Sequence, residues 1–147
     1  MNKVKHTASF EINQSINKLF PLFSPEGEKL WVPGWDYENI KGTNHLHEDY
    51  VFLTITHDHA STDAISLVKK YEPESYLVEF YKVEPKDKIG IITVQCTELK
   101  NADTKVQVTY EYIGLSKKGN EFVAKFSAAE YEDFIAEWES LLVKFFD

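Results

Sequence analysis

The sequence predicts an α+β fold: a seven-stranded antiparallel sheet wrapped around a long C-terminal helix, with two short helices between strands 1 and 2. Three observations support it: strict alternation over residues 3–12, six further β segments between residues 35 and 115, and an amphipathic stripe after Ser127. Segments joined by short turns pair as antiparallel neighbours. The 147 residues suit a single domain, and we expect residues 1–147 to form one.

The first strand and the first short helix follow from local patterns. Along residues 3–12 apolar and polar side chains alternate, which predicts a strand with one buried face. His6 lies on the apolar face, where we expect it to bond to a neighbour. Asn13 offers a helix cap, and apolar residues follow it at helical spacing. Pro21 limits this helix to about two turns because proline has no backbone N–H.

Ser24 and Pro25 predict the second short helix, with Ser24 as its cap and Pro25 in its first turn. This helix is expected to run to about Trp31, because Pro33 and Gly34 form a corner directly after it. The chain then turns into the next strand. We expect Trp31 to be a core residue.

The six further β segments are rich in β-branched and aromatic residues and are separated by short polar turns. They cover residues 35–41, 49–57, 64–72, 76–84, 88–99 and 104–115.

The last segment is the clearest helix. Ser127 and Glu130 form a capping box, and Phe126 and Tyr131 are placed to form its hydrophobic staple. Large apolar residues then recur at spacings of three and four, and only the predicted sheet is broad enough to bury them. This stripe consists of Tyr131, Phe134, Ile135, Trp138, Leu141, Leu142 and Phe145.

Composition excludes several classes of function. The net charge is −8, all 16 basic residues are Lys and there is no Arg, which argues against nucleic-acid binding. The single cysteine, Cys96, allows no internal disulfide, and mid-strand it is expected to be buried and inert. No apolar stretch is long enough for a membrane span or a signal peptide, so we expect a cytoplasmic protein.

Several stretches, together with the order of elements, resemble the START-like, or SRPBCC, superfamily, and within it a small bacterial group. These are residues 19–35 (LFPLFSPEGEKLWVPGW), 50–54 (YVFLT), 81–85 (YKVEP) and 108–122 (VTYEYIGLSKKGNEF). The superfamily includes hormone binders, lipid-transfer domains, polyketide cyclases and coenzyme Q-binding proteins. The resemblance covers nearly the whole chain and implies the helix-grip fold, with a cavity between sheet and C-terminal helix for an apolar or amphipathic ligand.

Alternation along the strands suggests which residues line such a cavity. We expect Val78, Ile91 and Thr93 to share the concave face of the sheet with the predicted ligand-binding residues. This face is therefore apolar with scattered hydroxyl groups. The predicted ligand-binding residues are Trp35, Tyr37, Phe52, Thr54, Phe80, Tyr110, Tyr112, Phe126 and Phe134. The alternative is a solid aromatic core without a cavity.

Four of the five histidines form two His-x-His pairs, at 45/47 and 57/59. The pairs flank one strand and are separated by roughly 20 Å, so they cannot share a metal ion. His57 and His59 with Asp63 are the better candidate for a metal site. The alternative is two polar turns, and we expect no cofactor.

Three functions remain open. The first is a carrier or sensor that binds a small hydrophobic or amphipathic molecule without chemistry. The second is a cyclase, dehydratase or hydrolase that acts in the same cavity, with His57 or Asp36 as acid–base candidates. The third is a protein-interaction module. Exposed edge strands are compatible with a monomer or a homodimer.

Overall fold

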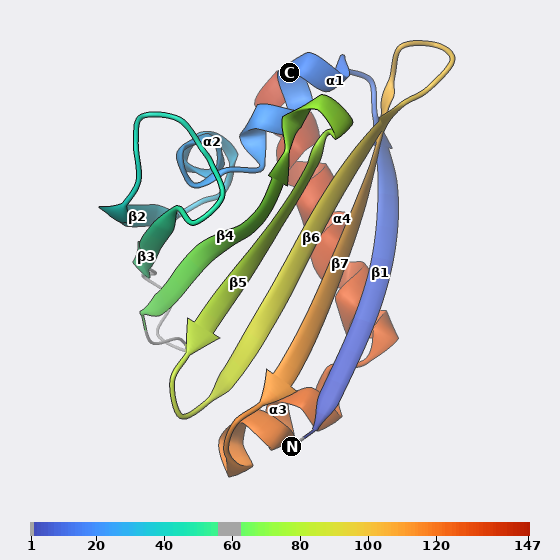
Figure 1. Cartoon of the computed structure of the whole chain (residues 1–147). Coiled ribbons are helices and arrows are strands. Elements are labelled where there is room, and N and C mark those ends of the chain that lie inside the picture. Colours follow the sequence, from blue (N-terminus) through green and yellow to red (C-terminus); the bar gives the residue numbers. More distant parts are fainter. Residues whose placement is uncertain (1, 56–62) are drawn as a thin grey trace.

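The computed structural model describes residues 2–55 and 63–147. Figure 1 shows one curved sheet with the long helix α4 packed behind it and short helices at both ends of the sheet. The elements are β1 (Lys3–Ile12), α1 (Ile16–Leu19), η1 (Phe20–Leu22), α2 (Pro25–Trp31), β2 (Asp36–Lys41), β3 (Val51–Ile55), β4 (Ala64–Glu72), η2 (Pro73–Ser75), β5 (Leu77–Glu84), β6 (Lys88–Glu98), β7 (Thr104–Gly114), α3 (Lys117–Lys125) and α4 (Ala128–Phe146).

The seven strands form one antiparallel sheet in the order β1-β7-β6-β5-β4-β3-β2, which confirms the predicted fold class. Strand β1 crosses over to pair with β7 along its whole length, from Lys3 opposite Ile113 to Ile12 opposite Thr104. The register shifts in β4 between Val68 and Lys70. Irregularities of this kind bend strands, and the curved sheet leaves a concave face for α4.

Helix α4 begins at the predicted cap, although the Ser127 backbone N–H donates to the Lys125 carbonyl oxygen at 2.9 Å and not to the Glu130 side chain. Ser127 Oγ accepts a hydrogen bond from the Glu130 backbone N–H at 3.1 Å. The Phe126 and Tyr131 rings of the staple lie 5.8 Å apart. The buried stripe is narrower than the sequence suggests, because Phe134 and Phe145 are 38% and 39% exposed. The buried residues of α4 are Tyr131, Ile135, Trp138 and Leu142.

The short helices between β1 and β2 differ from the prediction in one detail. The cap of α1 is Ser15 and not Asn13, so the chain runs two residues further before it turns into the helix. The second helix, α2, begins as predicted, with Ser24 Oγ accepting from the Gly27 N–H at 3.0 Å. A Cβ atom on Gly27 would lie 2.3 Å from the Pro21 carbonyl oxygen, so only glycine allows α2 to pack this closely on η1.

Helix α3 was not expected from the sequence, where residues 117–125 look polar and contain a glycine. Its cap is Ser116, whose Oγ accepts from the Gly119 N–H at 3.2 Å. Phe122 packs edge-on against Tyr112 of β7, with the ring centroids 5.0 Å apart. This tertiary contact stabilises a helix whose intrinsic propensity is weak.

Strand β6 faces the opposite way from the prediction. Ile91 and Thr93 lie on the outer, convex face, while Ile92 and Val94 face α4. The register decides this, because Ile92 pairs with buried Phe80 on one side and with Tyr110 on the other. Sequence alternation cannot distinguish the faces here, since β6 carries isoleucines at three of the four positions 89–92.

Candidate ligand-binding cavity

A cavity of about 80 Å³, here called the inner cavity, lies between the concave face of the sheet and α4. Its apolar wall consists of Phe23, Phe52, Phe80, Ile92, Val94 and Trp138. Its polar lining consists of Glu28, Trp35, Thr54, Ser66, Lys82 and Tyr110.

The sheet supplies its share of the lining through alternation and register. Phe52 and Thr54 are the two buried positions of β3, and Phe52 pairs with Ser66 of β4. The hydroxyl groups of Thr54 and Ser66 lie 3.4 Å apart. Phe80 of β5 pairs with Ile92 of β6, and Ile92 pairs with Tyr110 of β7. A row of side chains from three strands therefore forms one side of the cavity.

Aromatic packing fills the space beside the inner cavity. The ring of Trp138 on α4 stacks on Phe23 at 6.1 Å and meets Trp31 edge-on at 5.5 Å. Trp31 is 5% exposed, and its indole N–H donates to the Leu22 carbonyl oxygen at 2.9 Å. Trp31 is therefore a core residue, as expected, and this packing restricts the inner cavity to a small volume.

Two side chains of opposite charge line the inner cavity. Half-buried Glu28 comes from α2, and half-buried Lys82 comes from the concave face of β5. Desolvation raises the pKa of the Glu28 carboxyl from 4.5 to about 8, and the charge of Lys82 lowers it in part. Among the described residues no ion pair within 4.0 Å joins the two groups. At neutral pH Glu28 is therefore mainly protonated and can donate a hydrogen bond.

Trp35 belongs to the half-buried part of the inner cavity lining, together with Glu28 and Lys82, and this part is here called the mouth. It follows the Pro33–Gly34 corner, and Gly34 has φ +75°, a conformation that favours glycine. The Trp35 indole N–H donates to the Pro25 carbonyl oxygen at 2.8 Å, which ties the corner to α2. Trp35 remains half-buried, in contrast to Trp31.

The structure distributes the predicted ligand-binding residues over four places. Trp35, Phe52, Thr54, Phe80 and Tyr110 line the inner cavity. The other four lie elsewhere: Tyr37 on the outer side of α2, Tyr112 and Phe126 together beside α3, and Phe134 on α4.

The four outlying residues make their own aromatic contacts. The rings of Tyr112 and Phe126 meet edge-on at 5.1 Å. The Phe126 carbonyl oxygen lies 2.8 Å from His6 Nε2, so His6 bonds to a neighbour as expected. Phe134 meets Tyr110 edge-on at 5.4 Å from the far side. These contacts support the core and do not bring the four residues to the inner cavity.

The catalytic and metal candidates are not brought together among the described residues. Asp36 is exposed at the start of β2, and its Oδ1 accepts from the Tyr37 backbone N–H at 2.8 Å. His57 and His59 lie outside the described residues, while Asp63 is described and exposed. Within residues 2–55 and 63–147 no group of three His, Cys, Asp or Glu side chains could hold a metal ion.

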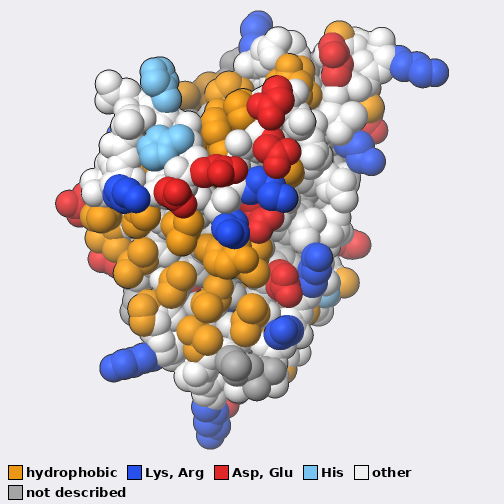
Figure 2. Space-filling model, viewed as in Figure 1, with side chains coloured by type: hydrophobic (Ala, Val, Ile, Leu, Met, Phe, Trp, Pro, Cys, Tyr) orange, Lys and Arg blue, Asp and Glu red, His pale blue; other side chains and the backbone are white. Residues whose placement is uncertain are grey.

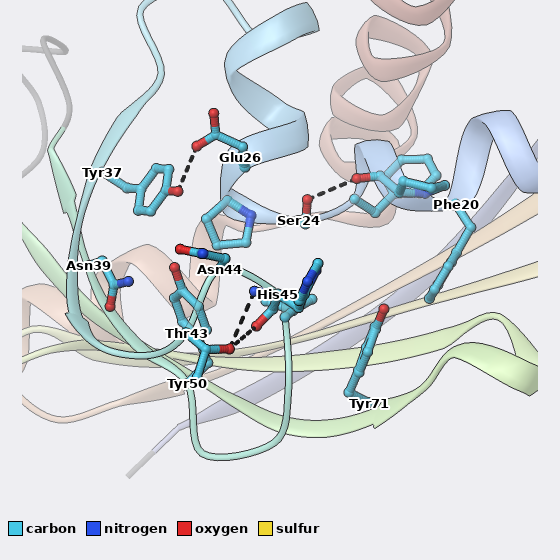
Figure 3. A pocket seen from close by; sticks show the side chains of 14 residues that line it. Phe20, Ser24, Glu26, Tyr37, Asn39, Thr43, Asn44, His45, Tyr50 and Tyr71 are labelled. Carbon is cyan, nitrogen blue, oxygen red and sulfur yellow. Dashed lines mark hydrogen bonds between the residues drawn. The ribbon is translucent and has the colours of Figure 1, made fainter.

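A second concavity, here called the outer pocket, opens on the other side of α2 and has a volume of about 420 Å³ (Figure 3). Figure 3 shows Glu26 and Tyr37 on one side, Phe20 and Tyr71 on the other, and His45 between them. The Phe20 and Tyr71 rings are nearly parallel, with centroids 6.2 Å apart.

The polar groups of the outer pocket are bonded mainly to one another. The Tyr37 hydroxyl donates to Glu26 Oε2 at 2.6 Å, and burial followed by this bond raises the pKa of Tyr37. Thr43 Oγ1 donates to the His45 carbonyl oxygen at 3.1 Å, and Asn39 Nδ2 donates to the Gly42 carbonyl oxygen at 3.3 Å. The pocket is therefore a surface depression held by local hydrogen bonds.

The convex face of the sheet carries a broad apolar area, here called the convex patch. Figure 2 shows apolar side chains gathered on this face, below a band of charged residues. They form two rows across β3, β4, β5 and β6: Leu53, Ile65, Val83 and Ile89, and beside them Val51, Leu67, Tyr81 and Ile91. Ile65 is 49% exposed.

Glu28 and Lys82 were missed by the sequence analysis, although signals for both were present. Lys82 alternates with Val78 and Phe80, which places it on the same face of β5. Glu28 lies three residues before buried Trp31, on the same side of α2. Both were passed over because charged residues are ordinarily assigned to solvent.

A scan with models of protein families and a search of curated proteins find no match to the sequence. Among the described residues no helix is both long and apolar enough to cross a membrane. Comparison with solved structures, in contrast, finds many similar folds.

Three solved structures illustrate this likeness, all with low sequence identity. Ara h 8.0201 has 10% identity and a TM-score of 0.70 over 95% of this chain and 93% of its own. TTHA0849 from Thermus thermophilus has 12% identity and a TM-score of 0.70 over 97% and 96%. A norcoclaurine synthase point mutant from Thalictrum flavum, in complex with a transition-state analogue, has 13% identity and a TM-score of 0.68 over 97% and 94%.

Identity this low is evidence about the fold alone. Together with the sheet order and the position of α4 in the concave face, the likeness shows that this chain has the helix-grip fold of START-like, or SRPBCC, proteins.

Proposed function

We propose that the protein binds a small hydrophobic or amphipathic molecule in the inner cavity, as a carrier or sensor. The observation that carries this proposal is the composition of the cavity: a mainly aromatic wall with a few convergent polar groups, between the sheet and α4. Ligand sites of small molecules have this composition, in which apolar surface supplies affinity and the polar groups fix orientation.

The volume limits the ligand. Pockets for drug-sized molecules measure roughly 300–1,000 Å³, well above the 80 Å³ of the inner cavity. The ligand is therefore short, or Trp35 moves aside to admit a longer one. Trp35 is suited to move, because one hydrogen bond to Pro25 holds its half-buried ring at the mouth.

Tryptophan fluorescence tests the proposal, since Trp35 and Trp138 both line the inner cavity. We expect 1-hexanol, a neutral probe with a slim apolar chain, to bind saturably and to change the emission. The variant Phe80→Trp, which fills the space beside the β5 wall, should weaken this binding. Tyr37→Phe in the outer pocket is the matched control and should bind as the wild type does. Absence of saturable binding to the wild-type protein for hexanol, butanol and octanol would refute the proposal.

The convex patch favours a second role, self-association, in addition to ligand binding. Eight apolar residues in two adjacent rows form a contiguous surface of the kind that marks protein–protein contacts. We expect a concentration-dependent homodimer in light scattering after gel filtration. Ile65→Lys should shift the dimer to monomer, whereas Lys105→Met, at an exposed position of β7, should not. A monomer at millimolar concentration would refute this role.

A further inference from the structure

We infer that the inner cavity selects a ligand with a carboxylate at one end, bound at the mouth by Lys82 and Glu28, and a short apolar chain that lies between Phe52, Phe80 and Trp138. This inference rests on the proposed function and specifies its ligand class. It follows from three features of the cavity: its charge, the depth of its polar groups, and its volume.

The charge of the lining favours an anion. Among the residues that the structure describes, the titratable side chains that line the inner cavity are Glu28 of α2, Lys82 of β5 and Tyr110 of β7. The Tyr110 hydroxyl is protonated near neutral pH even at its ordinary pKa, which burial raises further, and burial raises the pKa of the Glu28 carboxyl to about 8, so that this group is mainly protonated as well. Lys82 then contributes the remaining charge, which is positive. A ligand amine would meet this ammonium group with no carboxylate to offset it.

The next charged residue on the same face of β5 does not change this balance. Glu84 is buried, and Lys88 Nζ lies 3.1 Å from its Oε2. The Lys88 ammonium also lies 4.3 Å from the centroid of the Phe122 ring. Lys88 is shared with Asp87, with which Lys118 also pairs at 3.7 Å, so the charges of this group balance. Within the described part of the chain, Lys82 is left as the cation available to the inner cavity.

The polar groups also match the hydrogen-bonding needs of a carboxylate, which only accepts. The Lys82 ammonium and the protonated Glu28 carboxyl are donors, and the Tyr110 hydroxyl can donate from deeper in the cavity. Because no ion pair within 4.0 Å joins Glu28 to Lys82 among the described residues, a carboxylate can be bound between them. Hydrogen bonds that involve a charged group are the strong ones.

Depth decides the orientation of the ligand. Glu28, Trp35 and Lys82 are half-buried, whereas Phe52, Phe80 and Trp138 are almost fully buried. The carboxylate therefore stays at the mouth and the chain enters. A volume of 80 Å³ is well below the roughly 300–1,000 Å³ of pockets for drug-sized molecules, which suits a slim chain better than a ring system.

The experiment compares three probes of equal length, hexanoate, 1-hexanol and hexylamine, by calorimetric titration at pH 6.5. We expect hexanoate to bind at least about tenfold more tightly than 1-hexanol or hexylamine. A tenfold ratio of dissociation constants corresponds to about 1.4 kcal/mol of binding free energy. Between pH 6.5 and 9.0 the affinity for hexanoate should fall, because ionised Glu28 would then repel the ligand. The affinity for hexanol should change little.

Two variants assign the effect to its residues. Lys82→Met should reduce hexanoate binding to the level of hexanol, while Glu28→Gln should keep hexanoate binding and lose its pH dependence. Lys105→Met, exposed on β7, is the charge-matched control. If Lys82→Met does not fold, the wild-type protein provides the test. The ratio of its affinities for hexanoate and hexanol, measured at pH 6.5 and 9.0, then decides whether the inference holds.

Equal affinities for hexanoate and hexanol, or a preference for hexylamine, would overturn the carboxylate inference and leave the proposed function standing. Failure of all three probes to bind, together with failure of butanol and octanol, would refute the proposed function itself. A preference for hexanoate that persists unchanged in Lys82→Met would place the carboxylate elsewhere and also overturn the inference.

Discussion

The inner cavity and the outer pocket lie on opposite sides of α2. The smaller of the two, the inner cavity, has the lining that is better suited to a ligand. The outer pocket is about five times larger, at 420 Å³ against 80 Å³, but its polar groups are paired with one another and it is an open depression. The inner cavity is small, mostly apolar, and contains a desolvated carboxyl group and an ammonium group without a mutual ion pair. The proposed function therefore rests on the chemical content of the inner cavity and not on its volume.

Phe23 lines both concavities and separates them. Its ring is 2% exposed and packs on Trp31 and Trp138. Phe23→Ala should lower the free energy of unfolding by about 3–5 kcal/mol, because it removes a large buried side chain and leaves a cavity. Chemical denaturation measures this loss. A loss below about 1 kcal/mol would show that the two regions are not separated by a packed wall.

The pH dependence of stability distinguishes the two regions next. The folded-state pKa of Glu28 is raised from 4.5 to about 8, so the folded protein holds a proton that the unfolded chain releases. Its contribution is fully present below pH 4.5 and is lost as pH rises through 8, with a slope of at most about 1.4 kcal/mol per pH unit. The free energy of unfolding in urea, measured against pH for wild type and Glu28→Gln, isolates the contribution of Glu28 by difference. Glu26→Gln at the outer pocket is the control. Parallel pH profiles of wild type and Glu28→Gln would contradict the desolvated carboxyl.

The smallest effects should come from one aromatic residue on each side of α2. Trp35→Ala should weaken hexanol binding about tenfold and cost about 1–2 kcal/mol of stability, since it removes a half-buried ring and one hydrogen bond. Tyr37→Phe removes the bond to Glu26, should cost about 0.5–1.5 kcal/mol and should leave hexanol binding unchanged. Fluorescence titration and thermal unfolding measure both. Outright unfolding of Trp35→Ala would assign Trp35 to the core.

The sequence by itself determined most elements of this protein and their order. Period-two alternation predicted β1, the β-branched and aromatic residues between polar turns predicted the other six strands, and the Ser127 cap with the apolar stripe predicted α4, because these signals are local. Helix α3 was not predicted, because its stability depends on a contact with Tyr112 of β7 that no local pattern reveals.

Only the tertiary structure decided which side chains meet. Strand register turned Ile92 and Val94, instead of Ile91 and Thr93, toward α4. The path of the chain around the Pro33–Gly34 corner placed Trp35 in the inner cavity and Tyr37 in the outer pocket. The packing of α2 over β5 brought Glu28 and Lys82 to one cavity from positions 54 residues apart in the sequence. Such pairings depend on distances between elements, and those are set by packing of the whole core and not by the neighbours of a residue in the chain.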